Sequence, residues 1–479
     1  MIKTYLFYDL ETTGRNKCFD QAVQFAAIRT DLELRELERH EIQIKLNCDV
    51  VPDPEAMLVH RIPIHTMCQG ETEITALAKI HSLLNTPGTI SCGYNTLGFD
   101  DEFLRFGFYR NLLAPYTHQW ANGCSRMDLL PMAIFYYLYK NATISWPQIA
   151  GKPSLKLEHL NQENNLAPGV AHNALVDVEA TIGLARLFIQ ERAMWDYLLG
   201  YFNKQTDLDR MQQLTPVLQS GQTTCRIGLM IGETGAKDFY QFPALELGPH
   251  HHYKNQTLWL RLDTEKLLNA TPQTVPESTW VVHKKAGEPG LLLPFIERFH
   301  HYLSDDRQKV MQGNLNLLRM QPQLLQEIKA YHQEYTYPKI PAVDVDAGLY
   351  DSGFLTPVEQ KLCDTFHAIA IDKKIEIIAR CNNSRLKAMG KRILGRHYHA
   401  HLNPELQAEF DAYLSSIYTD SDQDSPIDYR GEKRLTATQA QQKVITLIAA
   451  ENLDSGRLQL LQELNQYISV KLSEVKAVD

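Results

Sequence analysis

Residues 4–14, TYLFYDLETTG, decide the architecture of the first part of the chain. The run is mostly apolar, which predicts a buried β-strand, yet it contains the acidic residues Asp9 and Glu11. At a spacing of two residues, both carboxylates project from the same face of a strand. Burying two carboxylates is costly unless a cation compensates them, and hard divalent cations suit paired carboxylates better than a buried Arg or Lys. A solvated edge strand is the simpler alternative, but LETTG is typical of the end of a strand.

The sequence after this strand alternates strand-like and helix-like segments up to about residue 190. Residues 21–47 contain two more strand-like runs, and residues 89–95 contain a short one. Helical periodicity is found at 73–85, 100–113, 126–140, 155–165 and 176–192. Strands interleaved with helices predict an α/β or α+β domain with a mixed sheet.

Asp100 is a third candidate acid, in the stretch GYNTLGFDDEF. It follows a short predicted strand and opens the next predicted helix. Taken alone, Asp100 would be read as a helix N-cap. We assign the neighbouring Asp101 and Glu102 to complementing the helix dipole.

His172 and Asp177 in AHNALVDVEAT complete the candidate set. On one continuous helix, residues five apart lie about 140° off-register and would not share a face. Pro168 and Gly169 break the preceding segment, so His172 can instead lie in the turn before the helix and lean over a site held by Asp177. A purely structural histidine is the alternative reading.

The sequence after about residue 205 has a different pattern of predicted elements. Short β-rich runs at 225–233, 258–263 and 280–285 are separated by predicted loops such as 245–256 and 285–290, which favours a small barrel-like β domain. We expect helical additions in residues 292–321 and a linker over residues 335–357. Amphipathic helices of an all-α domain are predicted at 357–370, 403–418 and 437–452, with a polar loop at 418–433.

The amino-acid composition limits the class of protein and the number of domains. A chain of 479 residues with 44% hydrophobic and 22% charged residues predicts a soluble protein of two to four domains. It contains no apolar run of the ~20 residues that cross a bilayer, and the N-terminus does not read as a signal peptide, so we expect a cytoplasmic protein. The eight cysteines form no CxxC pair, which excludes a zinc ribbon and a disulfide framework.

The formal net charge of -9 does not by itself favour a polyanionic partner. Net charge describes solubility and steering, however, rather than a single groove. Between Asp372 and Arg396, eight basic residues stand against two acidic ones. A solvated helix face and a surface that tracks phosphates are both compatible with this pattern.

The order DLET, NTLGFD and H-x4-D resembles the DEDDh 3′→5′ exonuclease superfamily, whose fold is ribonuclease H-like. The stretches GYNTLGFDDEFLRFGFYRN, RMDLLPM, KPSLKLEHL and AHNALVDVEATIGLA are similar to the bacterial exonuclease I family. This resemblance implies three domains: an exonuclease domain at 1–195, an SH3-like β domain at 200–348 and a helical domain at 349–475. The motif match is highly specific in residues 1–190 and looser beyond.

The resemblance also implies a chemistry. Asp9, Glu11, Asp100 and Asp177 would hold two Mg²⁺ ions, with Mn²⁺ expected to substitute, and His172 would act as general base. Glu11 would in addition meet the terminal 3′-hydroxyl. The implied activity is processive 3′→5′ degradation of single-stranded DNA to 5′-mononucleotides, in DNA repair and recombination.

Further family positions are expected to contact the strand. Arg105, Tyr116 and Trp120 match such positions, although core packing is the alternative for the two aromatic residues. Lys156 and Lys140 stand where the family commonly has Arg, which keeps the charge but loses the bidentate fork. Lys204 is a further expected contact.

The resemblance implies partners and an architecture as well. We expect a monomer that binds the acidic C-terminal tail of single-stranded-DNA-binding protein. We also expect the β and helical domains to encircle the DNA strand. A DEDDh ribonuclease or proofreading subunit, and a catalytically silent strand-binding scaffold, are the competing readings.

Overall fold

The computed structural model describes residues 2–169, 172–220, 223–351, 353–419, 425–450 and 453–476. The chain divides into two compact units. The first unit joins Met1–Ser125, Pro168–Glu179 and Lys339–Asp479, and the second joins Arg126–Ala167 and Ala180–Pro338. The first unit therefore combines the two ends of the sequence.

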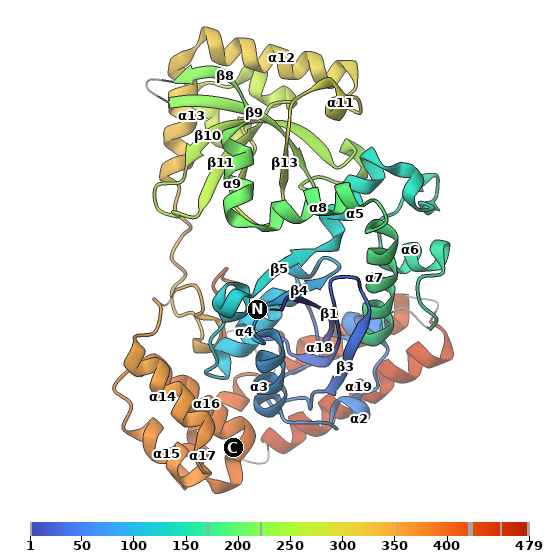
Figure 1. Cartoon of the computed structure of the whole chain (residues 1–479). Helices are drawn as coiled ribbons and strands as arrows, with labels where there is room; N and C mark the ends of the chain where they lie inside the picture. The colour runs from blue at the N-terminus through green and yellow to red at the C-terminus, as the bar shows by residue number, and fades with distance from the viewer. Residues whose placement is uncertain are drawn as a thin grey trace. The chain divides into compact units, whose positions relative to one another are not determined.

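A five-stranded mixed sheet is the centre of the first unit (Figure 1). Its strands are β1 (Thr4–Thr12), β2 (Ala22–Thr30), β3 (Glu36–Gln43), β4 (Thr89–Gly93) and β5 (Ser125–Asp128), in the order β3-β2-β1-β4-β5. Strand β1 runs antiparallel to β2 and parallel to β4. The mixed sheet and the buried first strand are confirmed, whereas β5 lies in a segment that was predicted to be entirely helical.

The two faces of β1 have different surroundings. Leu6, Tyr8 and Leu10 pack in one buried cluster with residues of α3 (Glu73–Leu84) and α4 (Asp100–Arg110). Side chains alternate along a strand, so Asp9 and Glu11 project from the opposite face. The strand alternation thus separates the apolar support of the sheet from its acidic residues.

Strand β4 ends before β1 does, and the chain then turns toward α4. The last parallel pair is Phe7 with Cys92. A Cβ atom on Gly93 would come within 2.7 Å of the Tyr8 carbonyl oxygen, so glycine permits this close approach. Asn95, in the left-handed region at φ 65°, leads into a 3₁₀ turn at Thr96–Gly98.

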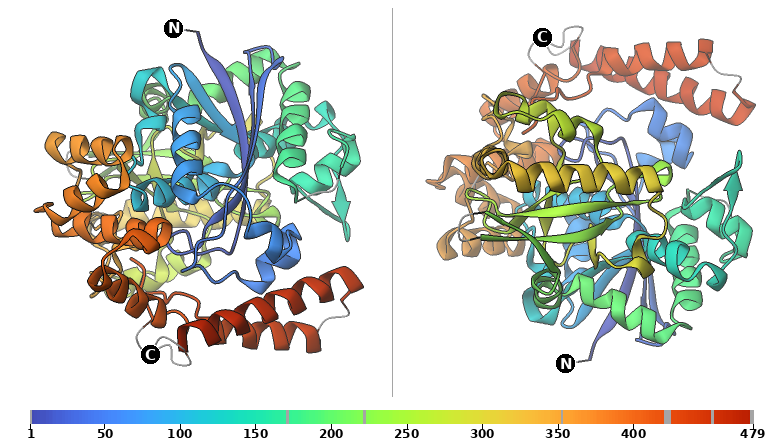
Figure 2. Two further views of the ribbon diagram at one scale, coloured as in Figure 1. Left: turned by 90° about the horizontal axis from the view of Figure 1, so that it is seen from below. Right: turned by 90° about the horizontal axis from the view of Figure 1, so that it is seen from above.

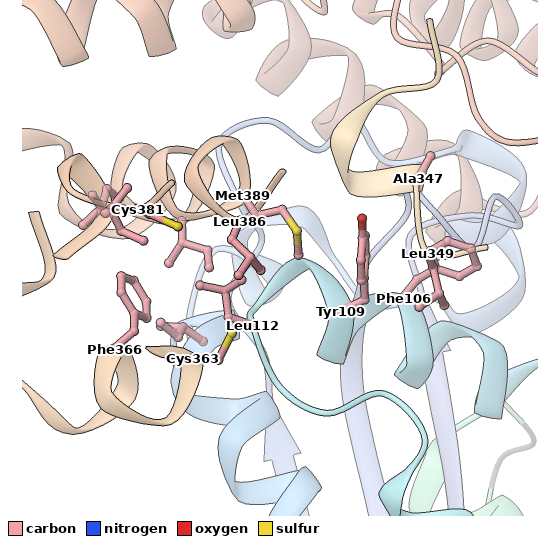
Figure 3. Packing of buried hydrophobic residues seen from close by; sticks show 14 of the residues in the cluster. Phe106, Tyr109, Leu112, Ala347, Leu349, Cys363, Phe366, Cys381, Leu386 and Met389 are labelled. Atoms are coloured by element: carbon pink, nitrogen blue, oxygen red, sulfur yellow. The ribbon is translucent and has the colours of Figure 1, made fainter. Parts of the chain in front are cut away.

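The helical end of the chain packs against the sheet domain within the same unit. Its helices are α14 (Pro357–Ala368), α15 (Ile371–Ala379), α16 (Ser384–Tyr398), α17 (Pro404–Ser415), α18 (Ala437–Ala450) and α19 (Ser455–Lys476). Figure 2 shows α18 and α19 lying side by side. Figure 3 shows Tyr109 and Leu112, at the end of α4, beside Leu386 and Met389 of α16. One hydrophobic core is therefore shared by segments more than 250 residues apart in the sequence.

A buried ion network also joins these segments. Arg396 pairs with Asp49 at 2.8 Å and with Asp346, and Arg434 approaches Asp49 at 3.6 Å. Burial acts to raise the pKa of Asp49, but Arg396 and Arg434 overcome it and hold the pKa below its usual range. Removing one partner of such a network would leave a buried charge uncompensated, at a cost of about 3–5 kcal/mol.

This network changes the interpretation of the basic run at 372–396. Arg396 is buried in it, and Lys374 is buried against Phe366. Lys391 pairs with Glu409. One of the two alternatives considered from the sequence, a solvated helix face, is therefore wrong for Lys374 and Arg396, and Arg396 helps to hold the helical region onto the sheet domain.

The second unit is built on an antiparallel sheet. Its strands are β8 (Thr215–Ser220), β9 (Thr223–Ile231), β10 (Gln241–Pro249), β11 (Gln256–Arg261), β12 (Val281–Lys285) and β13 (Leu291–Pro294). The order is β12-β11-β10-β9-β13, and β8 pairs with β9. The predicted loop at 245–256 is wrong in its first half, because a bulge between Glu246 and Gly248 lets β10 continue. Residues 292–294 form a strand rather than a helix, an ambiguity expected for a short apolar run.

Of the remaining elements, the helices that lie mainly within residues 126–140, 155–165, 176–192 and 292–321 were predicted from the sequence, whereas the others were not. Their bounds are α1 (Pro54–His60), α2 (Ile64–Met67), β6 (Gln148–Ile149), β7 (Lys152–Pro153), α5 (Leu129–Tyr139), α6 (Leu157–Asn164), α7 (Ala174–Phe188), α8 (Arg192–Leu199), α9 (Lys204–Gln212), α10 (Val275–Ser278), α11 (Glu297–His300), α12 (Asp305–Met320) and α13 (Pro322–Glu334). All eight cysteines are thiols, and six are buried, as expected. Across the described ranges, each helix is too short or too polar to cross a bilayer.

Candidate active site

Three of the predicted acids meet at the end of β1. Asp9 and Glu11 lie opposite Ala26 and Gln24 of β2. Asp177 comes from the first turn of α7. Each of the three offers an oxygen atom, and these atoms lie within 4.8 Å of one another. A single divalent cation could therefore bind all three carboxylates.

Asp100, the fourth predicted acid, borders this group without being part of it. It is the first residue of α4 and is buried. Its charge raises the pKa of both Asp9 and Glu11, so it lies within electrostatic reach of them. The four acids predicted from sequence are thus gathered from β1, α4 and α7.

The pKa values show how strongly these carboxylates interact. Burial, followed by the charges of Asp100, Glu11 and Asp177, raises the pKa of Asp9 well above its ordinary value. Burial, followed by Asp177 and Asp100, raises the pKa of Glu11 from 4.5 to about 8. Hard oxygen donors that repel one another in this way are a donor set suited to divalent cations, whose charge would offset the repulsion. The residues present therefore fit a divalent metal site.

His172 lies in the turn before α7, as the sequence predicted. Its backbone is in the left-handed region at φ 65°, and its N–H donates to Oδ2 of Asp177 at 3.1 Å. The side chain of Asn173 accepts from the N–H groups of Leu175 and Val176 and so caps the helix. The turn fixes His172 directly beside an acid of the candidate centre. Ala171, the first residue of the quoted motif, and the preceding Val170 lie outside the described residues.

An aromatic groove lies in the same unit. It is lined by Tyr116 and Trp120 from the segment after α4, and by Tyr350 and Phe354 from the segment before α14, with Arg385 of α16. Its cavity volume is about 390 Å³. Trp120 is 69% exposed and Phe354 is 91% exposed, which contradicts core packing for Trp120. Exposed aromatic rings around a cavity can stack against flat ligands.

Helix α4 connects this groove to the acids. Asp100 begins the helix, and the Tyr350 hydroxyl donates to Oε2 of Glu102, two residues later, at 2.5 Å. Arg105 pairs with Asp101 at 2.6 Å and with Glu102, and its guanidinium carbon lies 5.7 Å from the centre of the Tyr116 ring. At a rise of about 1.5 Å per residue, Arg105 lies roughly 8 Å along the helix from Asp100.

Basic residues surround Glu102 at this end of the groove. The electrostatic neighbours of Lys17 are Glu102, Arg430 and Arg105. Lys17 donates to the carbonyl oxygen of Gly98 at 2.8 Å, and Arg430 is exposed. This local positive charge could hold phosphates in a chain whose net charge is -9.

The other predicted strand contacts belong to the second unit. Lys156 and Lys140 have side chains that are 71% and 44% exposed. They pair with Glu158 and Glu191 respectively. Lys204 is the exposed first residue of α9. Each remains a prediction.

Sequence reasoning missed some residues of the site. Tyr350 and Phe354 fall in the segment that was read as a linker, where the aromatic residues beside Gly353 were the one available signal. His60 is a buried neighbour of His172, and its sequence context gives no such signal.

The convergent acids at the end of the central strand, with a histidine in the turn before the last of them, define a centre of the DEDDh exonuclease class. Comparisons with known proteins agree. Residues 6–185 match the exonuclease family, and residues 343–471 match the exonuclease I C-terminal domain family.

Individual relatives specify the family. Exodeoxyribonuclease I of Escherichia coli (strain K12) is 32% identical over 372 residues, which cover 73% of this chain and 76% of the relative. Exodeoxyribonuclease I of Buchnera aphidicola subsp. Baizongia pistaciae is 29% identical over 413 residues, covering 82% and 83%. The crystal structure of E. coli exonuclease I in complex with a dA16 oligonucleotide matches with a TM-score of 0.83 and 26% identity, covering 98% of this chain and 100% of that one. The chain belongs to the exodeoxyribonuclease I family.

The raised pKa of Glu11 predicts how stability depends on pH without metal. A carboxyl group whose folded pKa lies above its unfolded value stabilises the fold at low pH, and this contribution is lost as pH rises. For Glu11 the window runs from about 4.5 to about 8. In EDTA, the Glu11→Gln variant should therefore lose less thermal stability than the wild type between pH 5 and pH 8, by a few degrees in Tm.

Differential scanning fluorimetry at a series of pH values measures this difference. Glu163→Gln, at an exposed acid, is the control and should follow the wild-type curve. Added Mg²⁺ or Mn²⁺ should raise the Tm of the wild type at pH 8 more than that of Glu11→Gln. If Tm depended on pH in the same way for Glu11→Gln and the wild type, the repulsion between Glu11 and its neighbouring carboxylates would be contradicted.

Proposed function

We propose that this protein hydrolyses single-stranded DNA from its 3′ end and releases 5′-mononucleotides. The observation that carries the proposal is the convergence of Asp9, Glu11 and Asp177, with His172 bonded through its backbone to Asp177. Membership of the exodeoxyribonuclease I family supports the DNA substrate. The E. coli relative with a bound dA16 oligonucleotide supports a single strand.

The proposed metal is Mg²⁺, two ions in one centre, with Mn²⁺ as a substitute. Asp9, Glu11, Asp100 and Asp177 would hold these ions between them. When bound, such ions supply a water of lowered pKa and stabilise the leaving 3′-oxygen. Glu11 is proposed to meet the terminal 3′-hydroxyl as well.

His172 is proposed to take the proton of the attacking water. An imidazole has an ordinary pKa near neutrality, which suits a general base at physiological pH. The left-handed turn at His172 and the Asn173 cap hold the residue at the start of α7. The same turn fixes His172 relative to Asp177 without using the imidazole ring for that bond.

The aromatic groove is proposed to hold bases of the strand. Stacking on exposed aromatic rings binds any base, because every base has a flat face. Trp120 and Phe354 present the most exposed rings. Lys17 and Arg430 would attract phosphates at the end of the groove nearest to Asp100.

Lys140, Lys156 and Lys204 are proposed as further strand contacts, whereas Arg105 is proposed to act indirectly. Arg105 is buried and paired with two acids. We therefore assign it the task of ordering Tyr116 and Glu102 beside the strand, in place of a free phosphate contact. The three lysines are exposed enough to meet phosphates directly.

Several finer properties rest on family resemblance. The antiparallel β domain of the second unit is proposed to be SH3-like, and the protein to be a cytoplasmic monomer active in DNA repair and recombination. The acidic tail of single-stranded-DNA-binding protein is the proposed partner. Processive digestion is proposed too. It is best tested on the full chain with a DNA trap, because removing residues after 195 would expose the core that α4 shares with α16.

Digestion of end-labelled oligonucleotides tests the proposed function. With Mg²⁺, a 5′-labelled single strand of DNA should shorten from its 3′ end, while its blunt duplex and a matched RNA strand should persist. EDTA should abolish the reaction. Preferred digestion of RNA would favour the ribonuclease alternative, and binding without digestion would favour the inactive scaffold.

Replacing His172 tests the assignment of the base. His172→Ala should lower the turnover rate by roughly 10²–10⁴-fold, the usual contribution of general base catalysis. Strand affinity, measured by fluorescence anisotropy, should change by less than about threefold. Equal losses in rate and affinity would contradict the assignment.

Replacing Phe354 tests the groove. Loss of one stacked base costs about 1–3 kcal/mol, so Phe354→Ala should raise KM for a long strand at least about fivefold. Val358 is 79% exposed and does not line the groove, so Val358→Ala is the matched control and should leave KM unchanged. Equal KM values for the two variants would remove the groove from the proposed strand path.

A further inference from the structure

His60 is a buried histidine that the chemistry proposed so far does not use. It is the last residue of α1 and is 6% exposed. The next residue, Arg61, turns the chain in the left-handed region at φ 56°, and its N–H closes the helix on the carbonyl oxygen of Met57. The imidazole is therefore held at a fixed point of the backbone.

The hydrogen bond to Nδ1 determines which nitrogen of His60 carries the proton. The backbone N–H of Ile62 donates to Nδ1 at 2.9 Å. In a neutral imidazole the other nitrogen must then be the N–H donor. Burial, with a smaller contribution from the charge of His172, lowers the pKa of His60 to about 4. At neutral pH, His60 is consequently an uncharged ring with its donor at Nε2.

The Nε2 donor of His60 is unsatisfied among the residues that the structure describes. Within the described part of the chain, the Nε2 atom of His60 is buried and has no hydrogen-bond partner. Leaving a buried donor unsatisfied costs roughly 1–3 kcal/mol, and such groups in native proteins call for an explanation such as a bound ligand or water.

The position of His60 indicates which ligand could supply the acceptor. The charge of His172 reaches His60, and His172 is bonded to Asp177 of the candidate centre. Helix α1 is also tied to the end of β1, because the N–H of Asp53 donates to the carbonyl oxygen of Thr13 at 2.7 Å. The start of α1 is thus bonded beside the end of β1, and His60 at its other end lies within electrostatic reach of His172, next to the candidate centre.

We propose that His60 is a substrate contact, whose Nε2–H donates a hydrogen bond to a phosphate or sugar oxygen of the strand's 3′-terminal nucleotide. The proposal rests on the proposed nuclease function. An enzyme that degrades any sequence must recognise atoms common to all nucleotides, and the backbone oxygens are such acceptors. A neutral donor suits this position, because a second cationic imidazole would oppose proton uptake by His172.

Two substitutions distinguish the acceptor role of Nδ1 in His60 from the donor role of Nε2. In His60→Asn, the amide oxygen can replace Nδ1 as acceptor for Ile62, but no donor reaches the Nε2 position. In His60→Gln, the longer amide can place an N–H group near the Nε2 position. The two variants thus share polarity and differ in the distal donor.

Single-turnover and steady-state assays on end-labelled DNA test the proposal. His60→Asn should lower kcat/KM about tenfold, equally for strands ending in each of the four nucleotides, whereas His60→Gln should stay within about threefold of the wild type. Tm values check folding. If His60→Asn is unstable, His60→Met, which keeps the volume without a donor, replaces it in the comparison.

Three outcomes would overturn the proposal: wild-type kinetics in the variant without a donor, equal losses in both variants, or a loss that depends on the terminal base. A wild-type protein that releases no mononucleotides would instead refute the proposed function. The two failures are therefore distinguishable.

Discussion

The rest of the site depends on the repulsion between carboxylates confined at the end of β1. Asp9 and Glu11 lie on a central strand, the first half-buried and the second buried, and Asp100 and Asp177 add their charges from two helices. Burial and like charge act in the same direction here, so the pKa values rise rather than fall. The surrounding fold is stable enough to hold these carboxylates together despite their repulsion. A bound divalent cation would offset that repulsion.

The scaffold that holds these acids is not the sheet domain alone. Helix α4, which begins with Asp100, packs on the sheet through one face and on α16 through Phe106 and Tyr109. The loop after β3 is held by the pairing of Asp49 with Arg396. Helix α4, which carries Asp100, is thereby packed between the sheet from the start of the chain and α16 from its end. The aromatic groove is a consequence of the same packing, since its two walls come from those two regions.

Two histidines near the acids are held by backbone turns that non-glycine residues rarely adopt. His172 itself has φ 65°, and the residue after His60 has φ 56°. Each such conformation costs energy that the surrounding structure must offset. In return the turns set ring positions that a regular helix would not allow. His172 lies ahead of α7, and His60 is the last residue of α1, where the charge of His172 reaches it.

The sequence by itself determined the local structure and the residue types of the centre. The two-residue spacing in DLET, the breakers Pro168 and Gly169, and the periodicity of α3, α4 and α7 were sufficient to place all five predicted catalytic residues on the correct elements. These signals are local, and strand alternation and helix periodicity act over a few residues.

Only the tertiary structure decided which distant segments meet. Tyr350 and Phe354 looked like part of a linker, Arg396 like part of a charged surface, and His60 like an ordinary helix residue. Their roles depend on contacts across tens to hundreds of residues, which no local pattern encodes. The physical reason is that burial and pairing are properties of the packed chain. Arg396 is buried because Asp49 lies opposite it and pairs with it. Without such a partner, the same residue would be an exposed surface charge.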